Sequence, residues 1–379
     1  MVVIDTDFPG GNAVVTAQRG NEIELTKELR DTTTPWFYWS FRARFSAPGT
    51  YRFRFLDGAA CGPRGPAASR DDGRTWTWLG AESVFGEARE GFLFSADPAR
   101  DNGIRFCVGM QYQPLHWQAF LARHAGSPFL VSGVLTESRR HRRPVPLAYV
   151  EDAAAPGPRE TVFLTARHHC CEMMADYALE GILESALGND ELGADLRRRF
   201  RFAAVPFVDL DGVTDGDQGK NRRPHDYNRD YNDAPLYPEV RAVQQLMRQL
   251  RPAFVLDLHD PWLYGGTHER IHFPGPKEPL YEERLLRFSH MLAAAAPPEA
   301  PHDPADNILF GTGWNVDANY RQGRSCAAWA RAELHPLFAN SLEIPYANAG
   351  AVTLTPEAVR RLGRAVARTL LTYSDALRS

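Results

Sequence analysis

The sequence contains 379 residues, with 43 basic and 47 acidic side chains and a formal net charge of −4. Because the charges are nearly balanced and no long basic run is interleaved with aromatic residues, we do not expect nucleic acid as a partner. A chain of this length exceeds what one hydrophobic core usually organises, so we expect two domains.

The sequence also bears on the cellular compartment. The first residues lack the basic region and apolar core of a signal peptide, and no segment is long and apolar enough to span a bilayer. The five cysteines are scattered and odd in number, which fits a reducing compartment better than a disulfide scaffold. We therefore expect a soluble cytoplasmic protein without a membrane partner, and the sequence carries no signal for an oligomeric state.

Residues 1–135 are predicted to form the first domain, an antiparallel β-sandwich. Residues 36–45 and 51–56 alternate between apolar and polar side chains, and a turn-rich break separates them. Short runs at 91–95 and 104–110 follow at a spacing typical of sandwiches.

A Ser-x-Asp-x-Gly-x-Thr-Trp box occupies residues 69–76. Such boxes are repeated on the β-hairpins of sialidase-like propellers. One copy indicates a tight hairpin, with Asp71 and Gly73 in the turn and Trp76 packed below it. The alternative is a carbohydrate- or protein-binding module, which would favour a binding protein with a vestigial site over an enzyme.

Residues 136–144 are predicted to be a linker, because the basic run at 139–143 ends at Pro144 and is typical of a solvated connector. From residue 145 the pattern changes. Short apolar runs typical of strands alternate with amphipathic stretches typical of helices. The predicted strands are at 145–150, 161–165, 203–208 and 254–258, and the predicted helices are at 173–187, 239–250 and 356–377. Residues 145–379 are thus predicted to form an α/β domain with a mixed sheet and helices on both faces.

The string Arg-His-His-Cys-Cys-Glu at residues 167–172 follows one of these predicted strands. It can be read as His168-x-x-x-Glu172 or as His169-x-x-Glu172, and spacing alone does not choose between them. His259 ends another predicted strand, and strands of an open α/β sheet bind ligands at their carboxyl ends. Catalytic zinc sites keep three protein ligands and one open position, so the pattern predicts such a site. Taken alone, the string could instead cap a strand end with Glu172 facing solvent.

Two further segments carry groups that would suit an open zinc site. Residues 219–230 form a polar, positively charged loop, and guanidinium groups clamp carboxylates or stabilise an oxyanion. A solvated surface loop is the alternative. Glu343 lies in a short apolar strand at 340–346, and beside an open zinc it is a candidate general base.

With these motifs in this order, the sequence resembles the zinc metallocarboxypeptidases and, among them, the cytosolic carboxypeptidase-like branch. Residues 166–172 are similar to that family's Ala-Arg-x-His-Pro-Gly-Glu, residues 205–212 to its Val-Pro-x-x-Asn-Pro-Asp-Gly, and residues 226–229 to its Asp-Leu-Asn-Arg. Residues 256–259 and 341–343 match the strands of the third ligand and of the catalytic glutamate. The resemblance extends from residue 145 to the C-terminus, and the first part looks like the sandwich that precedes the catalytic domain in that branch.

The resemblance implies a zinc enzyme that hydrolyses the last peptide bond of peptide or protein substrates. His169, Glu172 and His259 would bind Zn²⁺. Glu343 would take a proton from the zinc-activated water and return it to the leaving amine. Asn228 and Arg229 are similar to the residues that hold the terminal carboxylate of the substrate, which would make the enzyme an exopeptidase.

Other roles implied by the resemblance are less closely tied to one residue. Arg222 would polarise the scissile carbonyl, because residues 219–222 resemble the family's Gly-Asn-x-Arg, and Arg223 is the alternative. Arg324 lies in the region that supplies the pocket for the last side chain, which favours acidic terminal residues, although a surface arginine is equally compatible. The tyrosine expected over the site is one of Tyr264, Tyr320 and Tyr346.

The sequence departs from the family at Cys170 and Cys171, which stand in place of Pro-Gly and would be either packing groups or sites of oxidation. Two other hydrolase classes share parts of the pattern. One is the aspartoacylase-like N-acyl amino acid deacylases, which share the His-x-x-Glu and the late histidine but are not expected to carry the β-rich first domain. The other is an amidase acting on peptidoglycan stem peptides.

Overall fold

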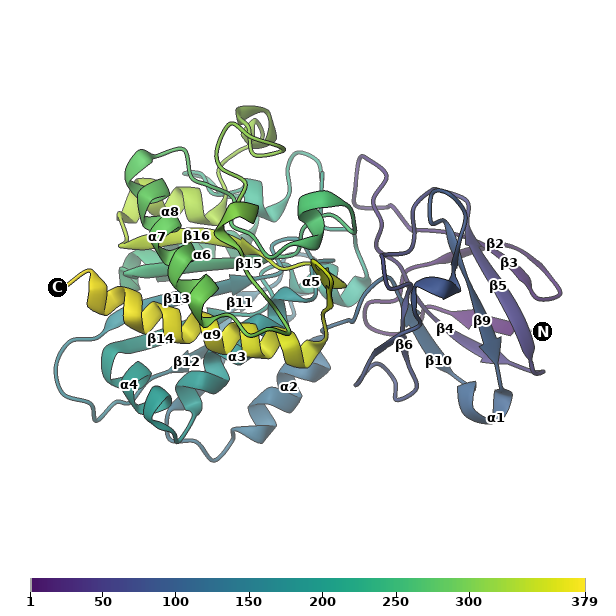
Figure 1. The fold of residues 1–379 in the computed structure, drawn as a ribbon, viewed down its shortest axis with the longest axis horizontal. Helices are drawn as coiled ribbons and strands as arrows, with labels where there is room; N and C mark the ends of the chain where they lie inside the picture. The colour runs from purple at the N-terminus through teal and green to yellow at the C-terminus, as the bar shows by residue number, and fades with distance from the viewer. Residues whose placement is uncertain (1, 379) are drawn as a thin grey trace.

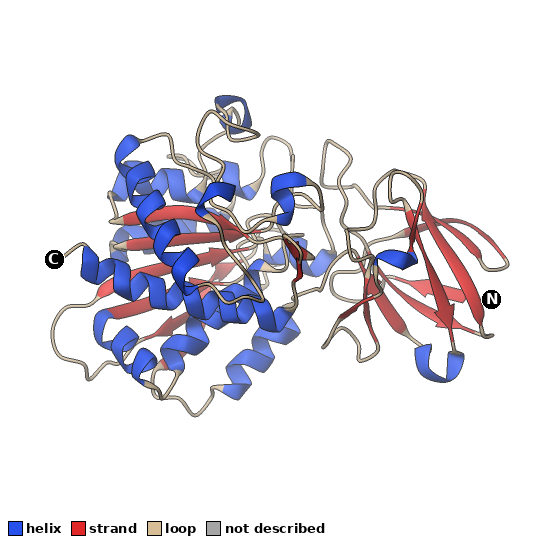
Figure 2. Ribbon diagram, in the orientation of Figure 1, coloured by secondary structure: helices blue, strands red, loops and turns tan. Residues whose placement is uncertain are grey.

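The computed structural model describes residues 2–378, which form two lobes (Figure 1). The β-rich lobe comprises residues 2–107, and residues 114–378 form an α/β lobe whose helices surround a central sheet (Figure 2). The predicted fold class, a β-sandwich followed by a mixed-sheet α/β domain, is confirmed.

The β-rich lobe consists of two five-stranded sheets. Their strand orders are β1-β4-β10-β6-β7 and β2-β3-β5-β9-β8, and all pairs are antiparallel except β3 with β5. The strands are β1 Val2–Asp5, β2 Val14–Arg19, β3 Glu22–Thr26, β4 Ser40–Phe45, β5 Gly49–Phe55, β6 Ala67–Ser69, β7 Thr77–Trp78, β8 Val84–Phe85, β9 Gly91–Ala96 and β10 Ile104–Cys107. Aromatic rings from both sheets fill the space between them, such as Phe41 with Phe53 and Phe92 with Phe106, each pair 5.3 Å apart between ring centroids.

The predicted strand at 36–45 begins only at Ser40. The backbone of the preceding Tyr38 forms hydrogen bonds with the α/β lobe instead of with a strand. Its N–H donates to Gln218 Oε1 at 2.9 Å, and its carbonyl accepts from Gln218 Nε2 at 2.8 Å. Residues 36–38 therefore join the two lobes rather than extend a sheet.

A six-stranded sheet forms the centre of the α/β lobe, in the order β11-β12-β14-β13-β15-β16. The four strands from β14 to β16 in that order are parallel, whereas β11 and β12 run antiparallel to their neighbours. The strands are β11 Leu130–Glu137, β12 Pro144–Val150, β13 Glu160–Ala166, β14 Phe200–Val205, β15 Phe254–His259 and β16 Phe338–Glu343, followed by a small pair, β17 Asn348–Ala349 and β18 Val352–Thr353. The parallel strands are almost entirely buried, as expected for a sheet with helices on both faces.

Residues 136–144 were expected to link two domains, and the structure corrects this. They include the turn of a hairpin, because β11 pairs with β12 and so belongs to the α/β lobe rather than to the sandwich. The basic turn is held by Asp211, whose carboxylate accepts hydrogen bonds from Ser138 Oγ at 2.8 Å, Arg140 N at 2.7 Å and Arg143 Nη1 at 2.9 Å. Asp211, which is distant in the sequence, thus neutralises part of the positive charge that indicated a solvated connector.

Nine α-helices occur in residues 2–378, and the predicted helices correspond to α3, α6 and α9. Their bounds are α1 Pro98–Asp101, α2 Pro114–Arg123, α3 Ala175–Leu187, α4 Glu191–Arg199, α5 Leu210–Asp215, α6 Pro238–Leu250, α7 Pro279–Ala295, α8 Cys326–Leu334 and α9 Pro356–Ala376. Glycines allow α3 and α9 to approach closely, since a Cβ at Gly181 would lie 2.1 Å from Arg360 O and one at Gly363 would lie 2.2 Å from Ala178 O.

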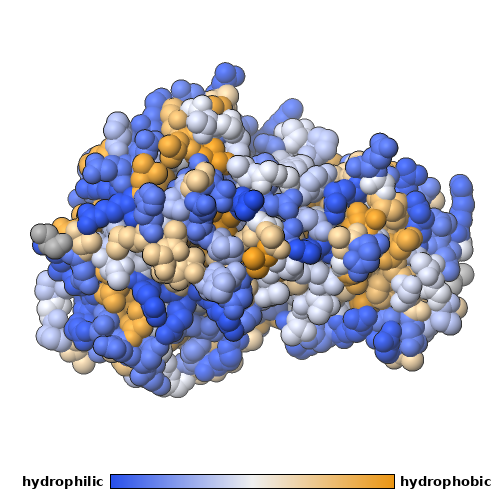
Figure 3. Space-filling view, in the orientation of Figure 1, coloured by the Kyte–Doolittle hydropathy of each residue, from blue (hydrophilic) through white to orange (hydrophobic). Residues whose placement is uncertain are grey.

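On the face shown in Figure 3, hydrophilic residues cover most of both lobes and apolar residues lie in small groups among them. Across residues 2–378, none of the helices has the length and apolar character needed to cross a membrane.

Candidate metal centre

Three side chains converge at the carboxyl ends of the parallel strands. His169 and Glu172 lie in the loop after β13, and His259 is the last residue of β15. Glu172 bridges the histidines, with Oε1 2.8 Å from His169 Nδ1 and Oε2 2.6 Å from His259 Nδ1. One ligand atom from each residue lies within 4.8 Å of the others, so the three can hold one metal ion.

The electrostatics of this cluster favour a cation. Burial alone would raise the pKa of Glu172, but the nearby His169, Lys220 and His259 hold it well below its ordinary value. Burial would lower the pKa of His259, whereas the carboxylates of Asp257 and Glu172 hold it well above its ordinary value. A buried carboxylate that stays ionised between two imidazoles provides the negative potential that a metal ion needs.

Each histidine has a second carboxylate behind it. His259 Nε2 lies 2.8 Å from Asp257 Oδ2, and His169 Nε2 lies 3.5 Å from Asp226 Oδ1. Outer carboxylates of this kind fix the ring orientation and the tautomer of metal-binding histidines. Because Nε2 of each ring faces its outer carboxylate, the Nδ1 atoms of His169 and His259 both point at Glu172.

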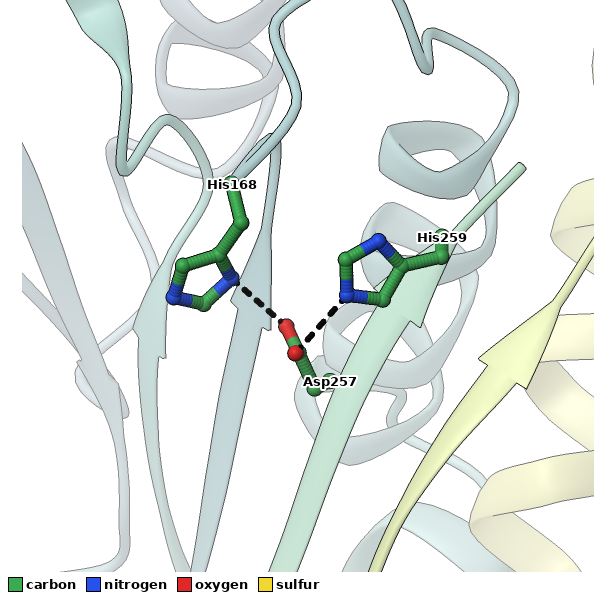
Figure 4. Close-up of side chains that lie close together, drawn as sticks. All are labelled: His168, Asp257 and His259. Carbon is green, nitrogen blue, oxygen red and sulfur yellow. Dashed lines mark hydrogen bonds and ion pairs between the residues drawn. The ribbon is translucent and has the colours of Figure 1, made fainter. Parts of the chain in front are cut away.

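His168 occupies a different place. Figure 4 shows Asp257 between the rings of His168 and His259. His168 Nδ1 lies 2.8 Å from Asp257 Oδ1, and His168 Nε2 lies 2.7 Å from the hydroxyl of Tyr231. Both nitrogens of His168 therefore have partners, and the structure brings His169 rather than His168 to Glu172.

The donor set fits zinc, because two imidazole nitrogens and one carboxylate are a common three-ligand set of catalytic zinc sites. His169 Nε2 and Asp226 Oδ1 face each other behind the candidate site. Both atoms are buried, and neither makes a hydrogen bond within residues 2–378. Their separation of 3.5 Å allows a small adjustment of the His169 ring to complete that contact.

Glu343 lies beside the three candidate ligands. It ends β16 and is the register partner of His259 on the neighbouring strand. Both residues line a cavity of about 440 Å³, together with His169, Asn228 and Arg229. Burial raises the pKa of Glu343 above its ordinary value, although the nearby His259 opposes this shift.

Asn228 and Arg229 lie in a short 3₁₀ turn on the wall of the same cavity. Asn228 Oδ1 accepts a hydrogen bond from the N–H of Cys326 at 3.0 Å, and Asn228 Nδ2 lies 3.2 Å from His259 Nε2. The Arg229 guanidinium donates to the carbonyl of Asn319 at 3.1 Å and lies 5.1 Å from the centroid of the Tyr320 ring. Both side chains are therefore oriented by neighbours.

Arg222 lies outside the lining of this cavity. Its guanidinium pairs with Asp31 at 2.9 Å, Asp209 at 2.7 Å and Asp217 at 3.1 Å, and the side chain is 9% exposed. Arg223 is exposed on the surface of the loop. Neither residue lies where a carbonyl-polarising group is expected.

Lys220 lies beside the candidate ligands, although the sequence motifs did not indicate it. It lines the cavity, and its Nζ lies 3.2 Å from His169 Nδ1 and 3.5 Å from Glu172 Oε1. A signal was present, since Lys220 stands two residues before Arg222 in the loop with the family motif. Trp36, Trp262 and Trp314 also line the cavity and were not predicted to do so.

Arg324 lines a neighbouring cavity of about 250 Å³. Its Nη1 pairs with Glu333 at 2.8 Å, so the charge is partly neutralised. Arg331 lines the same cavity, is 8% exposed and pairs with Glu278 at 3.0 Å. Tyr320 and Ser325 line both cavities, which are therefore adjacent.

Among the candidate tyrosines, Tyr320 faces the cavity. The Tyr346 ring is buried and its hydroxyl donates to the carbonyl of Cys171 at 3.1 Å. The two cysteines that replace Pro-Gly are buried packing groups. Burial raises the pKa of Cys171 to about 12 and that of Cys170 well above its ordinary value, so neither is a reactive thiolate at neutral pH.

Curated relatives of this chain include cytosolic carboxypeptidases. An uncharacterized protein of Zymomonas mobilis is 28% identical over 264 residues, which are 68% of this chain and 67% of that protein. Cytosolic carboxypeptidase 6 of Caenorhabditis elegans is 27% identical over 47% of this chain and 41% of its own length, and that of Homo sapiens is 26% identical over 57% and 43%. The matches thus span less than half of either carboxypeptidase, and no protein-family model matches the chain.

Solved structures share the fold over both lobes. The metallo-carboxypeptidase of Pseudomonas aeruginosa superposes with a TM-score of 0.81 at 20% identity, covering 99% of this chain and 100% of that one. That of Burkholderia cenocepacia gives a TM-score of 0.78 at 18% identity and covers 99% of each chain. The chain therefore has the fold of these metallo-carboxypeptidases and is similar in sequence to cytosolic carboxypeptidases.

Proposed function

We propose that the protein is a zinc-dependent carboxypeptidase that hydrolyses the last peptide bond of peptides or protein tails. The observation that carries this proposal is the shared cavity of about 440 Å³, which is lined by His169, His259, Glu343, Asn228 and Arg229. Groups for binding a metal, for moving a proton and for binding a carboxylate therefore face one space. The names of the cytosolic relatives support a cytoplasmic location.

His169, Glu172 and His259 would hold the zinc ion. Zinc bound by three protein ligands activates water and polarises a carbonyl oxygen. The chain's own contribution is to keep both Nδ1 atoms and the Glu172 carboxylate aimed at one point, through Asp226 and Asp257 behind the rings.

Glu343 is the proposed general base. Its carboxylate lies at the wall of the cavity beside His259, where it can accept a proton from the attacking water and pass it to the leaving amine.

Asn228 and Arg229 are proposed to bind the free carboxylate of the terminal residue. An amide N–H and a guanidinium donate charge-assisted hydrogen bonds to a carboxylate, and both groups line the cavity. A carboxylate bound there requires a chain end, which supports exopeptidase action over internal cleavage.

An acidic preference for the terminal side chain is the finer part of the proposal. The adjacent cavity of about 250 Å³ contains Arg324, Arg331 and Lys277. Arg331 pairs with Glu278, Lys277 with Asp317 and Arg324 with Glu333, so an acidic side chain of the substrate would compete with these carboxylates. Arg331 is a second candidate beside Arg324, because it is the more deeply buried of the two.

One experiment tests the proposal as a whole. Zinc content is measured, and the purified protein is given peptides that end in Glu, Asp, Lys, Phe and Ala, with the same peptides amidated at the C-terminus as controls. We expect release of the terminal residue from free peptides, fastest for Glu or Asp, and none from the amides. Hydrolysis of N-acetyl amino acids or of peptidoglycan stem peptides in place of these substrates would favour the deacylase or amidase alternatives.

A further inference from the structure

We infer that Lys220 supplies the positive charge that faces the scissile carbonyl oxygen of the substrate, and that the β-rich lobe holds it in that place. This inference rests on the proposed carboxypeptidase function and adds a catalytic residue to it. Lys220 would thus polarise the scissile carbonyl, which is the role that the family motif implies for Arg222.

The Lys220 ammonium lies beside two of the candidate ligands. Its Nζ is 3.2 Å from His169 Nδ1 and 3.5 Å from Glu172 Oε1, and the residue lines the cavity shared with Glu343. A carbonyl group attacked in this cavity must approach the ion that these ligand atoms would hold. Its oxygen would therefore come within hydrogen-bonding reach of Lys220, which has three N–H donors and a flexible stem.

Arg222 is already engaged in ion pairs away from the cavity. Its guanidinium pairs with three carboxylates, those of Asp31, Asp209 and Asp217, and Asp209 and Asp217 are fully buried. Turning it toward the cavity would take the cationic partner away from the buried Asp209 carboxylate, which is strongly unfavourable. Arg222 therefore stabilises the loop through these ion pairs, while Lys220 reaches the cavity from the same loop.

The backbone on either side of Lys220 is held by the β-rich lobe. Asp31 accepts hydrogen bonds from the N–H of Gln218 at 2.9 Å and of Gly219 at 2.8 Å. Thr33 donates to the carbonyl of Asn221 through N at 3.1 Å and through Oγ1 at 2.7 Å. Residues before and after Lys220 are thus tied to one segment of the β-rich lobe.

The conformation of the loop makes these ties necessary. Gly219 and Asn221 both have positive φ, 78° and 52°, so Lys220 is carried between two residues in the left-handed region. A Cβ at Gly219 would lie 2.4 Å from the backbone nitrogen of Cys170, so only glycine fits there. The Trp36 ring, also from the β-rich lobe, lies 5.8 Å from Lys220 Nζ and completes its surroundings.

The test compares three variants of the full-length protein with the wild type. For Lys220→Met we expect kcat to fall about 100- to 1,000-fold, the range for loss of one oxyanion donor, with KM changed by less than about threefold. Zinc content and the thermal midpoint should equal those of the wild type. Lys220→Arg should recover part of the rate, because a guanidinium also donates to an oxygen.

Arg223→Met is the matched control, since it removes an exposed charge from the same loop and should leave kcat unchanged. The inference is overturned if Lys220→Met keeps kcat within about threefold of the wild type, or if its loss of activity is matched by an equal loss of zinc. A zinc-loaded wild-type protein that releases no terminal residue from any peptide would overturn the proposed function and this inference together. Active wild type with an equally active Lys220→Met would overturn the inference alone.

Discussion

Glu343 and His259 are register partners at the carboxyl ends of two neighbouring parallel strands, β16 and β15. Adjacent strands lie about 4.8 Å apart, so the pairing places a carboxylate beside a candidate metal ligand without help from a loop. The geometry of this pair is therefore set by the hydrogen bonding of the sheet.

Replacing Glu343 by Gln should abolish turnover while zinc remains bound. The amide keeps the size and the hydrogen bonding of the side chain but does not accept a proton, so kcat should fall at least about 100-fold. The measurements are kcat on a peptide that the wild type cleaves and zinc content by atomic absorption. Near wild-type turnover in the variant would rule out Glu343 as the general base.

Replacing Asp257 by Asn should weaken zinc binding. Asp257 contacts His168 and His259 through different oxygens, each at 2.8 Å, and an amide offers one acceptor oxygen in place of two. We expect zinc affinity to fall about 10- to 100-fold, as for other carboxylates that support histidine ligands. Competition with a chromophoric chelator measures this, with the exposed Asp233→Asn as control. Equal affinity in the two variants would contradict the supporting role.

Removal of zinc should lower both activity and stability. An ion that binds only the native state stabilises it by about 2.7 kcal/mol when its free concentration is 100 times Kd. Dialysis against a chelator should therefore lower the thermal midpoint, and added zinc should restore it together with peptide hydrolysis. His169→Ala should show neither response to zinc, because it lacks one of the three ligands.

Replacing Asp31 by Asn should destabilise the contact between the lobes. The Asp31 carboxylate accepts hydrogen bonds from Gln218 N, Gly219 N and Arg222 Nε, and an amide would leave at least one donor unpaired or face it with an N–H. A lost buried hydrogen bond of this kind costs about 1–3 kcal/mol. Calorimetry should show a lower thermal midpoint, and kcat should fall because the Lys220 loop is less well held. An unchanged midpoint would argue against this contact.

Stability should fall as the pH rises from about 4.5 to about 7, through Glu239. Burial first, and then the nearby Asp209 and Asp211, raise the pKa of Glu239 from 4.5 to about 7. The native state thus binds a proton that the unfolded chain releases near pH 4.5, so the contribution is fully present below that pH and is lost as the pH rises through about 7.

Glu239→Gln should remove this dependence. The amide oxygen can still accept the hydrogen bond that Arg139 N donates at 2.8 Å, while the buried charge is gone. Since one pKa unit corresponds to about 1.36 kcal/mol, we expect a gain on the order of 2 kcal/mol at pH 8 and little change at pH 4. Denaturant unfolding at both pH values measures it, with Glu299→Gln on the surface as control. A gain that is equal at both values would contradict the role of ionisation.

The principal elements of the α/β lobe could be predicted from the sequence because their signals are local. The apolar runs that became β13 and β15, and the amphipathic stripe that became α6, depend only on neighbours within one element. The candidate ligands follow two predicted strands, and the family resemblance favoured His169 over His168 where the spacing left both open.

Only the tertiary structure decided which groups of the loop at 219–230 reach the cavity. The role of Arg222 depends on Asp31, nearly 200 residues earlier in the chain, and a buried carboxylate draws a guanidinium toward it whatever the local motif suggests. The same holds for the hairpin at 136–144, whose basic turn is neutralised by Asp211. The sequence by itself determined strands such as β13 and β15, the helices α3, α6 and α9, and, with the family motifs, the candidate metal ligands, because these depend on local patterns. Ion pairs and hydrogen bonds between segments distant in the sequence decided where Arg222 and the basic turn at 136–144 lie, because such contacts form only when the whole chain folds.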